Sequence, residues 1–146
     1  MSDKFFIDTN IFIYTFDTKD HEKKSIATLL IQNTLNSGDG VISYQVVQEF
    51  LNVATRKFKH PLTALDAKKY LETVLTPLCQ VYASLEMFAQ AIEISERWQY
   101  GYYDSLIVAA AISSGCSVLY TEDLHDGQKI QSIEIVNPFK KETRGY

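Results

Sequence analysis

The sequence has few of the residues that mark specialised classes of chain: two cysteines, three prolines and six glycines among 146 residues. So little proline and glycine, together with 46% hydrophobic residues, excludes a collagen-like, linker-rich or disordered chain. Cys79 and Cys116 have neither a CxxC partner nor a histidine nearby, so we interpret both as small buried hydrophobic residues, not as a disulfide or a zinc site. The length then suits one compact domain.

Long apolar runs are missing as well. The longest, Leu106–Ile112, has seven residues, whereas a membrane-spanning helix needs about 20. The N-terminus reaches Asp8 after a short apolar run, so we expect no secretory signal, no membrane segment and a cytoplasmic protein. The formal charge of -4, from 18 acidic and 14 basic residues, gives no support for bulk binding of a polyanion. Any contact with nucleic acid must therefore be local.

Short apolar runs alternate with longer segments of helical spacing along the chain. The runs predict about five strands, at Phe5–Ile7, Val41–Ser43, Gln80–Tyr82, Ser117–Tyr120 and Ile133–Val136. The segments between them predict helices at His21–Leu35, Gln45–Phe58, Thr63–Thr76, Leu85–Trp98 and Tyr103–Ser114. This alternation predicts an α/β fold, with one domain over residues 1–139, a mostly parallel sheet and helices on both faces. A polar C-terminal tail follows at residues 140–146.

Acidic residues follow two of the expected strands. Asp8 comes directly after the first apolar run, and Glu122 and Asp123 follow the strand that begins at Ser117. In open α/β sheets the ligand crevice lies beyond the carboxyl ends of the strands. Two strands are therefore expected to bring carboxylates to one edge of the sheet.

Two further acids lie on helices whose neighbouring residues face the core. Glu49 shares a helix face with Val46 and Val53, and Asp104 begins the apolar segment that contains Ile107. A carboxylate beside a buried stripe needs a cation, hydrogen bonds or a raised pKa, because an unpaired buried charge is very unfavourable.

Each acid also has an ordinary structural explanation. Asp104 precedes a helical run and could act as its N-cap, worth about 1 kcal/mol. Asp8 could serve the turn after its strand, and Glu49 could be solvated or pair with Arg56 or Lys57. Glu122, Asp123 and Asp126 could belong to a plain surface loop. The functional interpretation depends on their joint occurrence.

Several carboxylates held together raise one another's pKa unless a multivalent cation neutralises them. Mg²⁺ or Mn²⁺ suits such a site, because a hard ion binds a few carboxylates, keeps several waters and then accepts phosphate oxygens. The net charge of -4 equals that of Asp8, Glu49, Asp104 and Asp123 together. The remaining surface is then balanced and would not repel a nucleic acid.

Four segments resemble, in order, the motifs of the PIN-domain ribonuclease family: Phe6–Asn10, Gln48–Asn52, Tyr103–Ala111 and Leu119–Asp123. Within the family the chain is similar to the VapC type, the toxic half of bacterial and archaeal toxin–antitoxin pairs. The likeness runs from Lys4 to about Phe139. It implies a Mg²⁺- or Mn²⁺-dependent endoribonuclease with an RNA substrate, often a homodimer, and inhibited by a small antitoxin whose tail enters the acidic groove.

The resemblance also implies roles for individual residues. Asp8, Glu49, Asp104 and Asp123 match the four family acids in order, Thr121 matches a hydroxyl residue before the fourth acid, and Asn10 a polar residue beside the first. Glu122 and Asp126 lie close enough in sequence to leave open which acid completes the site. Alternation along an extended segment favours Asp123, which shares a side with Thr121.

The resulting hypothesis is hydrolysis of an RNA phosphodiester by a water that one or two divalent ions activate. Arg56, Lys57 and Lys59 form a basic cluster that could bind RNA phosphates, or could merely complement the dipole at a helix C-terminus. Aromatic residues near Asp104 suit a dimer interface or the core better than base stacking; they are Trp98, Tyr100, Tyr102 and Tyr103. The alternative function is a non-catalytic domain of the same fold that binds RNA or a protein.

Overall fold

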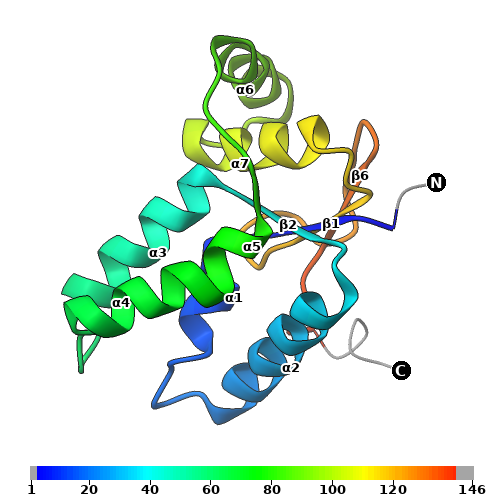
Figure 1. Ribbon diagram of the computed structural model, residues 1–146. Helices are drawn as coiled ribbons and strands as arrows, with labels where there is room; N and C mark the ends of the chain where they lie inside the picture. The colour runs from blue at the N-terminus through cyan, green and yellow to red at the C-terminus, as the bar shows by residue number, and fades with distance from the viewer. Residues whose placement is uncertain (1–2, 141–146) are drawn as a thin grey trace.

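Six strands form one sheet in the computed structural model, which describes residues 3–140 (Figure 1). They are β1 (Phe5–Ile7), β2 (Gly40–Ser43), β3 (Cys79–Val81), β4 (Val118–Tyr120), β5 (Lys129–Ile130) and β6 (Ile133–Val136), in the spatial order β3-β2-β1-β4-β6-β5. All pairs are parallel except β5 with β6. The five expected strands are present, and β5 is an addition. Most of the expected tail, residues 141–146, lies outside the described residues.

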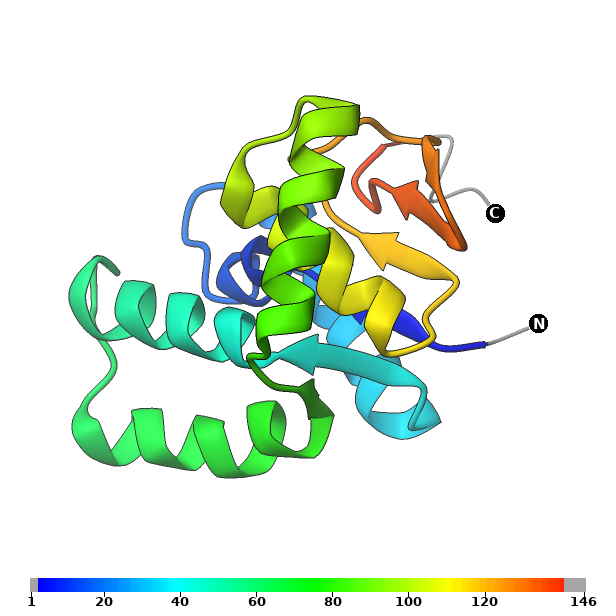
Figure 2. The same cartoon turned by 90° about the horizontal axis from the view of Figure 1, so that it is seen from above.

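The strand order places β1 near the middle of the sheet, between β2 and β4. Phe6 and Ile7 are fully buried there, as expected for a strand covered on both faces. The parallel strands end at the same edge, toward which the arrowheads point in Figure 2. Residues that directly follow β1 and β4 are thereby brought together.

The helices are α1 (Thr9–Tyr14), α2 (His21–Ser37), α3 (Tyr44–Arg56), α4 (Ala64–Tyr70), α5 (Thr76–Leu78), α6 (Leu85–Trp98) and α7 (Tyr102–Ser113). A π-helical turn, η1 (Leu71–Leu75), joins α4 to α5. The expected helix Thr63–Thr76 is therefore helical from Ala64 onward, but it changes from α-helix to π-helix before Pro77. The other four expected helices are confirmed with small shifts of their ends. Helix α1 was not anticipated.

Helices cover both faces of the sheet. In Figures 1 and 2, α6 and α7 lie over one face and α1 and α2 over the other, while α3 and α4 run side by side beyond the carboxyl ends of the strands. Helix α7 is buried from Ser105 to Ala111, between the sheet and α6. This burial anchors the first turn of α7 at the edge where the strands end.

Helix α2 lies close to β2 because the strand begins with a glycine. A Cβ at Gly40 would collide with the Cγ2 of Thr34, a fully buried residue of α2. No helix among the described residues is long and apolar enough to cross a membrane.

Candidate active site

A cavity of about 330 Å³ opens at the carboxyl edge of the sheet, and we call it the acidic cavity. Asp8, Glu49, Asp104 and Asp123 all line it, so segments up to 115 residues apart in the sequence meet there. The rest of its lining consists of Thr9, Asn10, Ile13, Gln45, Asn52, Val53, Lys57 and Ile107. The four acids that the motifs single out are therefore neighbours in space.

Asp8 follows the last residue of β1 and is the N-cap of α1. Its Oδ1 accepts a hydrogen bond from the backbone N–H of Thr9 at 2.7 Å, and its Oδ2 accepts one from the hydroxyl of Thr121 at 2.9 Å. The turn role considered for Asp8 is thus real. It coexists with a place in the cavity, because the same two bonds orient the carboxylate at the end of the strand.

Glu49 is half-buried on α3 and is held by two neutral donors. Its Oε1 accepts from the hydroxyl of Thr9 at 2.6 Å, and its Oε2 from the side-chain amide of Gln45 at 3.2 Å. Within the described part of the chain it forms no ion pair with Arg56 or Lys57. The pairing considered for Glu49 is therefore wrong.

Thr9 and Gln45 were not predicted as partners of Glu49. Gln45 lies four residues before Glu49, a spacing that puts both side chains on one face of a helix. Thr9 directly follows Asp8, but its contact with Glu49 depends on the packing of α1 against α3, which no local pattern shows.

Asp104 is the third residue of α7, whose N-cap is Gly101, so the N-cap explanation for Asp104 is wrong. Among residues 3–140 its carboxylate accepts no hydrogen bond, and it is only partly exposed at the cavity wall. Of the four acids it is the one whose oxygens have no protein partner in this part of the chain.

The three acids after β4 separate into different surroundings. The Asp123 carboxylate lines the acidic cavity and accepts a hydrogen bond from the side-chain amide of Asn10 at 3.0 Å. Glu122 pairs instead with Lys23, at 2.8 Å, and accepts a bond from the Tyr14 hydroxyl. Asp126 accepts a bond from the backbone N–H of Asn137 and lies 3.7 Å from the Lys140 ammonium. Neither Glu122 nor Asp126 lines the cavity.

Burial raises the pKa of Asp8 to about 7, despite its two hydrogen bonds, and the charges of Asp123 and Glu49 add to the rise. Burial also raises the pKa of Asp104, with a further contribution from Glu49. The pKa of Asp123 is raised by burial and then by neighbouring carboxylates. The cavity thus gathers negative charge that the protein itself does not fully neutralise.

These donors fit a hard divalent cation that keeps much of its water. No three His, Cys, Asp or Glu side chains within residues 3–140 form a ready-made ligand cluster. The polar lining of the cavity consists of carboxylates, of hydroxyl and amide groups, and of one lysine, Lys57. Mg²⁺ commonly binds through one or two carboxylates and several waters, so it does not need a closed cage of protein ligands.

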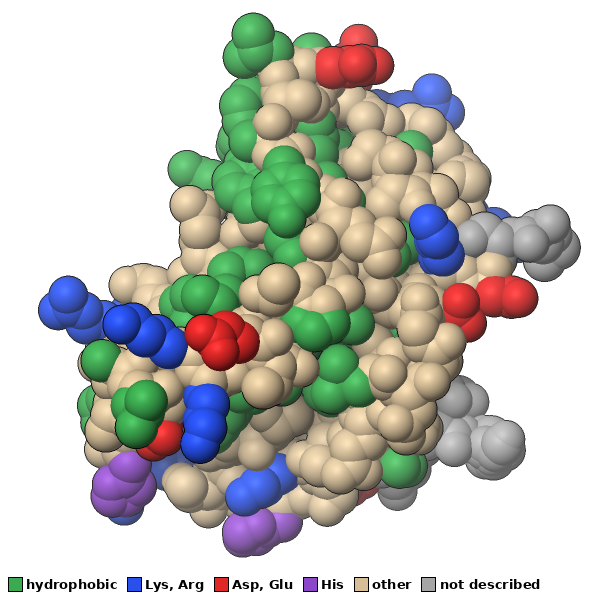
Figure 3. All heavy atoms as spheres, viewed as in Figure 1, with side chains coloured by type: hydrophobic (Ala, Val, Ile, Leu, Met, Phe, Trp, Pro, Cys, Tyr) green, Lys and Arg blue, Asp and Glu red, His purple; other side chains and the backbone are tan. Residues whose placement is uncertain are grey.

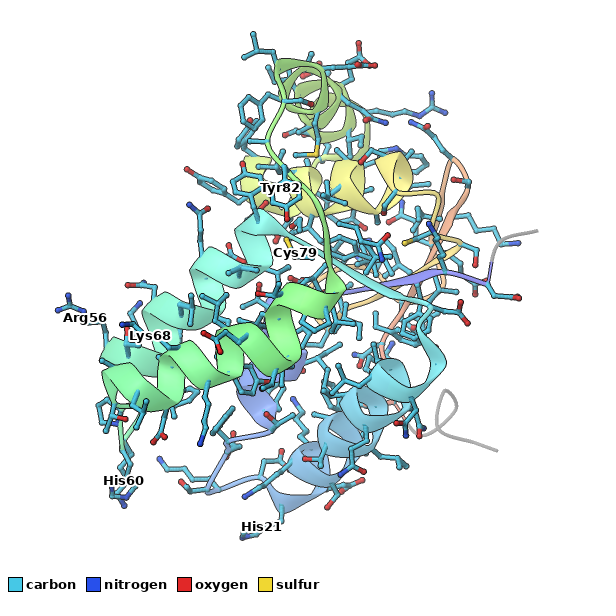
Figure 4. The ribbon with its side chains drawn as sticks, in the orientation of Figure 1. His21, Arg56, His60, Lys68, Cys79 and Tyr82 are labelled. Atoms are coloured by element: carbon cyan, nitrogen blue, oxygen red, sulfur yellow. The ribbon has the colours of Figure 1, made fainter. Side chains whose placement is uncertain are left out.

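Two of the three basic residues expected to contact RNA lie at or beside this cavity. Lys57 lines it, and Lys59 lines an adjoining depression, whereas Arg56 lines neither. Figure 4 shows Arg56 near the outer end of α3, directed away from the body of the protein. In Figure 3, Lys and Arg side chains gather around the outer ends of α3 and α4.

A family model described as the PIN domain matches residues 5–125, and the chain belongs to this family. Comparison with curated protein sequences gives no match. The solved structures it resembles include a toxin–antitoxin complex from Klebsiella pneumoniae, at 18% identity and a TM-score of 0.65, covering 91% of this chain and 96% of that one.

Two further structures have the same fold. VapC20 of Mycobacterium tuberculosis, described as a sarcin–ricin loop cleaving toxin, is 18% identical with a TM-score of 0.63, covering 82% of this chain and 90% of that one. VapBC2 of Rickettsia felis, bound to a promoter DNA fragment, is 18% identical with a TM-score of 0.61. The likeness covers 90% of this chain and 96% of that one. At such identities the likeness establishes the fold.

Proposed function

We propose that the protein is a divalent-metal-dependent endoribonuclease, the toxin of a toxin–antitoxin pair. The observation that carries the proposal is the meeting of Asp8, Glu49, Asp104 and Asp123 around one cavity at the carboxyl edge of the sheet. Membership of the PIN domain family and the likeness to toxin structures support it.

In this proposal the four acids hold Mg²⁺ or Mn²⁺, directly or through water. A bound ion supplies a Lewis acid that polarises the scissile phosphate and lowers the pKa of an attacking water. Asp104, whose oxygens have no hydrogen-bond partner among residues 3–140, and the second oxygen of Asp123 are the acceptors most available to an ion. Asp8, buried at the end of β1, marks the inner end of the site.

The neighbouring polar side chains act as positioning residues. Thr121 holds the Asp8 carboxylate, Asn10 holds Asp123, and Thr9 holds Glu49. Each is neutral, so it orients an acid without competing for the cation. Removal of such a partner typically costs 10–100-fold in metal affinity or activity.

RNA is proposed to approach over Arg56, Lys57 and Lys59. Lys57 lines the acidic cavity and Lys59 the adjoining depression, while Arg56 lies at the end of α3 outside both. Phosphate contacts of this kind give affinity without sequence information. Replacement of Lys57 and Lys59 by alanine should reduce the salt dependence of RNA binding.

Two protein partners belong to the same proposal. An antitoxin segment would occupy the acidic cavity and displace RNA. A second copy of the chain would cover the exposed aromatic surface beside α3, where Tyr82 is 68% and Tyr103 is 69% exposed. Apolar exposure of this kind is typical of an interface. Light scattering of Tyr103→Glu beside the wild type tests the dimer.

The alternative is a PIN domain that binds RNA or a protein without cleaving it. The lack of a ready-made ligand cluster among residues 3–140 is the observation in its favour. A cleavage assay on total RNA, with EDTA and then with added Mg²⁺ or Mn²⁺, separates the two functions. Cleavage that EDTA abolishes and metal restores supports the nuclease; metal binding with intact RNA supports the alternative.

A further inference from the structure

A second cavity, of about 340 Å³, adjoins the acidic cavity. Ile13 and Lys57 line both, so the two hollows share a wall and form a continuous surface. We call the second hollow the flanking groove. None of the four acids of the acidic cavity lines it.

Two segments distant in sequence build the flanking groove. Residues 16–19, between α1 and α2, form one side, and residues 57–60, after α3, form the other. Figure 4 shows His60 at the turn between α3 and α4 and His21 at the start of α2, with the α1–α2 connection running between them.

The rim of the groove is cationic. Lys19, Lys57 and Lys59 are exposed there, against one carboxylate, that of Asp17. The Asp17 Oδ1 accepts hydrogen bonds from the backbone N–H groups of Lys19 and Asp20, at 2.7 and 3.0 Å. Asp17 therefore shapes its own loop, and the lysines leave the groove with an excess of positive charge.

The floor of the groove is partly aromatic. Phe16 and Phe58 are half-buried, and their ring centroids are 5.3 Å apart. Behind them lies Phe50, which contacts both rings and is fully buried. A cluster of three packed aromatic rings thus lies beneath the lysine rim.

This combination matches an unpaired nucleotide. Proteins that bind single strands combine a positively charged groove for the backbone with aromatic residues for the bases. A volume of about 340 Å³ lies at the lower end of the range of small-ligand pockets, which suits one nucleotide and not a duplex. Unpaired bases are also the parts of RNA that proteins reach most readily.

We propose that the flanking groove binds one unpaired nucleotide of the RNA, adjacent to the scissile phosphate held at the acidic cavity. The inference rests on the proposed ribonuclease function and adds a nucleotide subsite of this chain, formed by residues 16–19 and 57–60. Lys57, at the shared wall, would contact the phosphate between the two sites. Lys19 and Lys59 would hold the next phosphate, with its base against Phe16 and Phe58.

An acidic peptide from a protein partner would also be attracted to these lysines. The RNA strand is favoured because the groove is continuous with the acidic cavity through Lys57, and because its floor is aromatic. The peptide is therefore made an outcome of the test.

The first experiment measures RNA binding without cleavage. A fluorescent single-stranded 12-mer of oligouridylate is titrated with protein in EDTA, over a range of NaCl, and followed by anisotropy. Lys19→Glu combined with Lys59→Glu should weaken binding at least tenfold and lower the salt slope by about 0.7 for each lysine. Lys129→Glu, a charge reversal on β5 at the far edge of the sheet that equals each single groove substitution, should bind like the wild type.

The second experiment locates the strand. The same oligonucleotide with single 4-thiouridine substitutions is crosslinked by light, and the modified peptides are identified by mass spectrometry. We expect crosslinks within residues 16–19 or 57–60. Crosslinks confined to other segments would overturn the inference. Circular dichroism melts check that the variants fold. If the charge-reversal variant does not fold, Lys19→Gln combined with Lys59→Gln replaces it.

The outcomes separate this inference from the proposed function. If the wild type cleaves RNA with Mg²⁺ and the groove variant binds and cleaves equally well, the groove inference fails and the ribonuclease stands. If the wild type neither binds nor cleaves RNA, the proposed function fails and the inference fails with it. If the variant keeps RNA affinity but loses affinity for hexaglutamate, the groove is a peptide site and the RNA inference is wrong.

Discussion

The hydroxyl of Thr121, just beyond β4, donates a hydrogen bond to the Asp8 carboxylate, just beyond β1, at 2.9 Å. Both side chains are buried, and 113 residues separate them in the sequence. Since β1 and β4 are parallel neighbours, this bond ties their carboxyl ends together. The orientation of the first acid therefore depends on a residue from the last part of the site.

Replacement of Thr121 should damage the site less than replacement of Asp8. Thr121→Ala removes a bond that orients the carboxylate, so we expect a 10–100-fold loss of cleavage and of Mn²⁺ affinity. Asp8→Asn removes the charge itself and should abolish both. Calorimetry with Mn²⁺ and cleavage of total RNA measure the two effects. Thr121→Ser keeps the hydroxyl and serves as the matched control; a folded Asp8→Asn with normal cleavage would refute the assignment of Asp8.

The buried Asp8 should make stability in EDTA depend on pH. An aspartate in the unfolded chain ionises near pH 3.9, whereas in the folded protein the pKa of Asp8 is raised to about 7. Between these values the folded state binds more protons, so its stability falls as pH rises from about 4 to about 7 and then stays level. The loss is about 4 kcal/mol at its upper limit.

Asp8→Asn removes this loss. Its melting temperature in EDTA should exceed that of the wild type at pH 8, and the difference should shrink as the pH falls to 5. Added Mg²⁺ should raise the melting temperature of the wild type at pH 8 and leave the variant unchanged. A variant less stable than the wild type at both pH values would show that the buried charge of Asp8 does not destabilise the fold.

Lys23 on α2 should stabilise the loop that carries Asp123. Its ammonium lies 2.8 Å from Glu122, 4.8 Å from the centre of the Tyr14 ring and 5.3 Å from that of Phe139. Lys23→Met leaves the Glu122 charge without its cation, at a cost of about 1 kcal/mol in stability. It should also weaken Mn²⁺ binding severalfold, because the contact that fixes Glu122 also fixes the position of the adjoining Asp123. Lys24→Met, an exposed neighbour on the same helix, is the control, and equal effects of the two variants would refute the role.

Much of the fold was predictable because its signals are local. Five strands and five helices follow from apolar runs and helical spacing, and the acids at the ends of β1 and β4 follow from parallel topology. Helix α1 gave no such signal, since Thr9–Tyr14 is short and contains β-branched residues that suit a strand equally well. Its helical state depends on the Asp8 cap and on burial of Ile11 and Phe12.

The features that escaped prediction depend on contacts between distant segments. Strand β5 has two residues and exists through pairing with β6. Thr9 reaches Glu49 only because α1 packs against α3. Glu122 points away from Asp123, as alternation predicts, but its contacts with Lys23 and Tyr14 join distant segments and were not predictable. Conversely, Asp104 looked like a helix cap, but the helix begins earlier, at Tyr102, with Gly101 as its N-cap. Sequence patterns place residues along elements, whereas tertiary packing decides which side chains meet.

The central claim is that Asp8, Glu49, Asp104 and Asp123 together hold a divalent ion at the acidic cavity. Anomalous diffraction from a crystal soaked in Mn²⁺, collected at the manganese absorption edge, tests it most directly. The account predicts a peak within the cavity, coordinated by at least one of these carboxylates and lost in Asp104→Asn. A well-diffracting soaked crystal with no peak there, or with manganese bound only elsewhere, would contradict it.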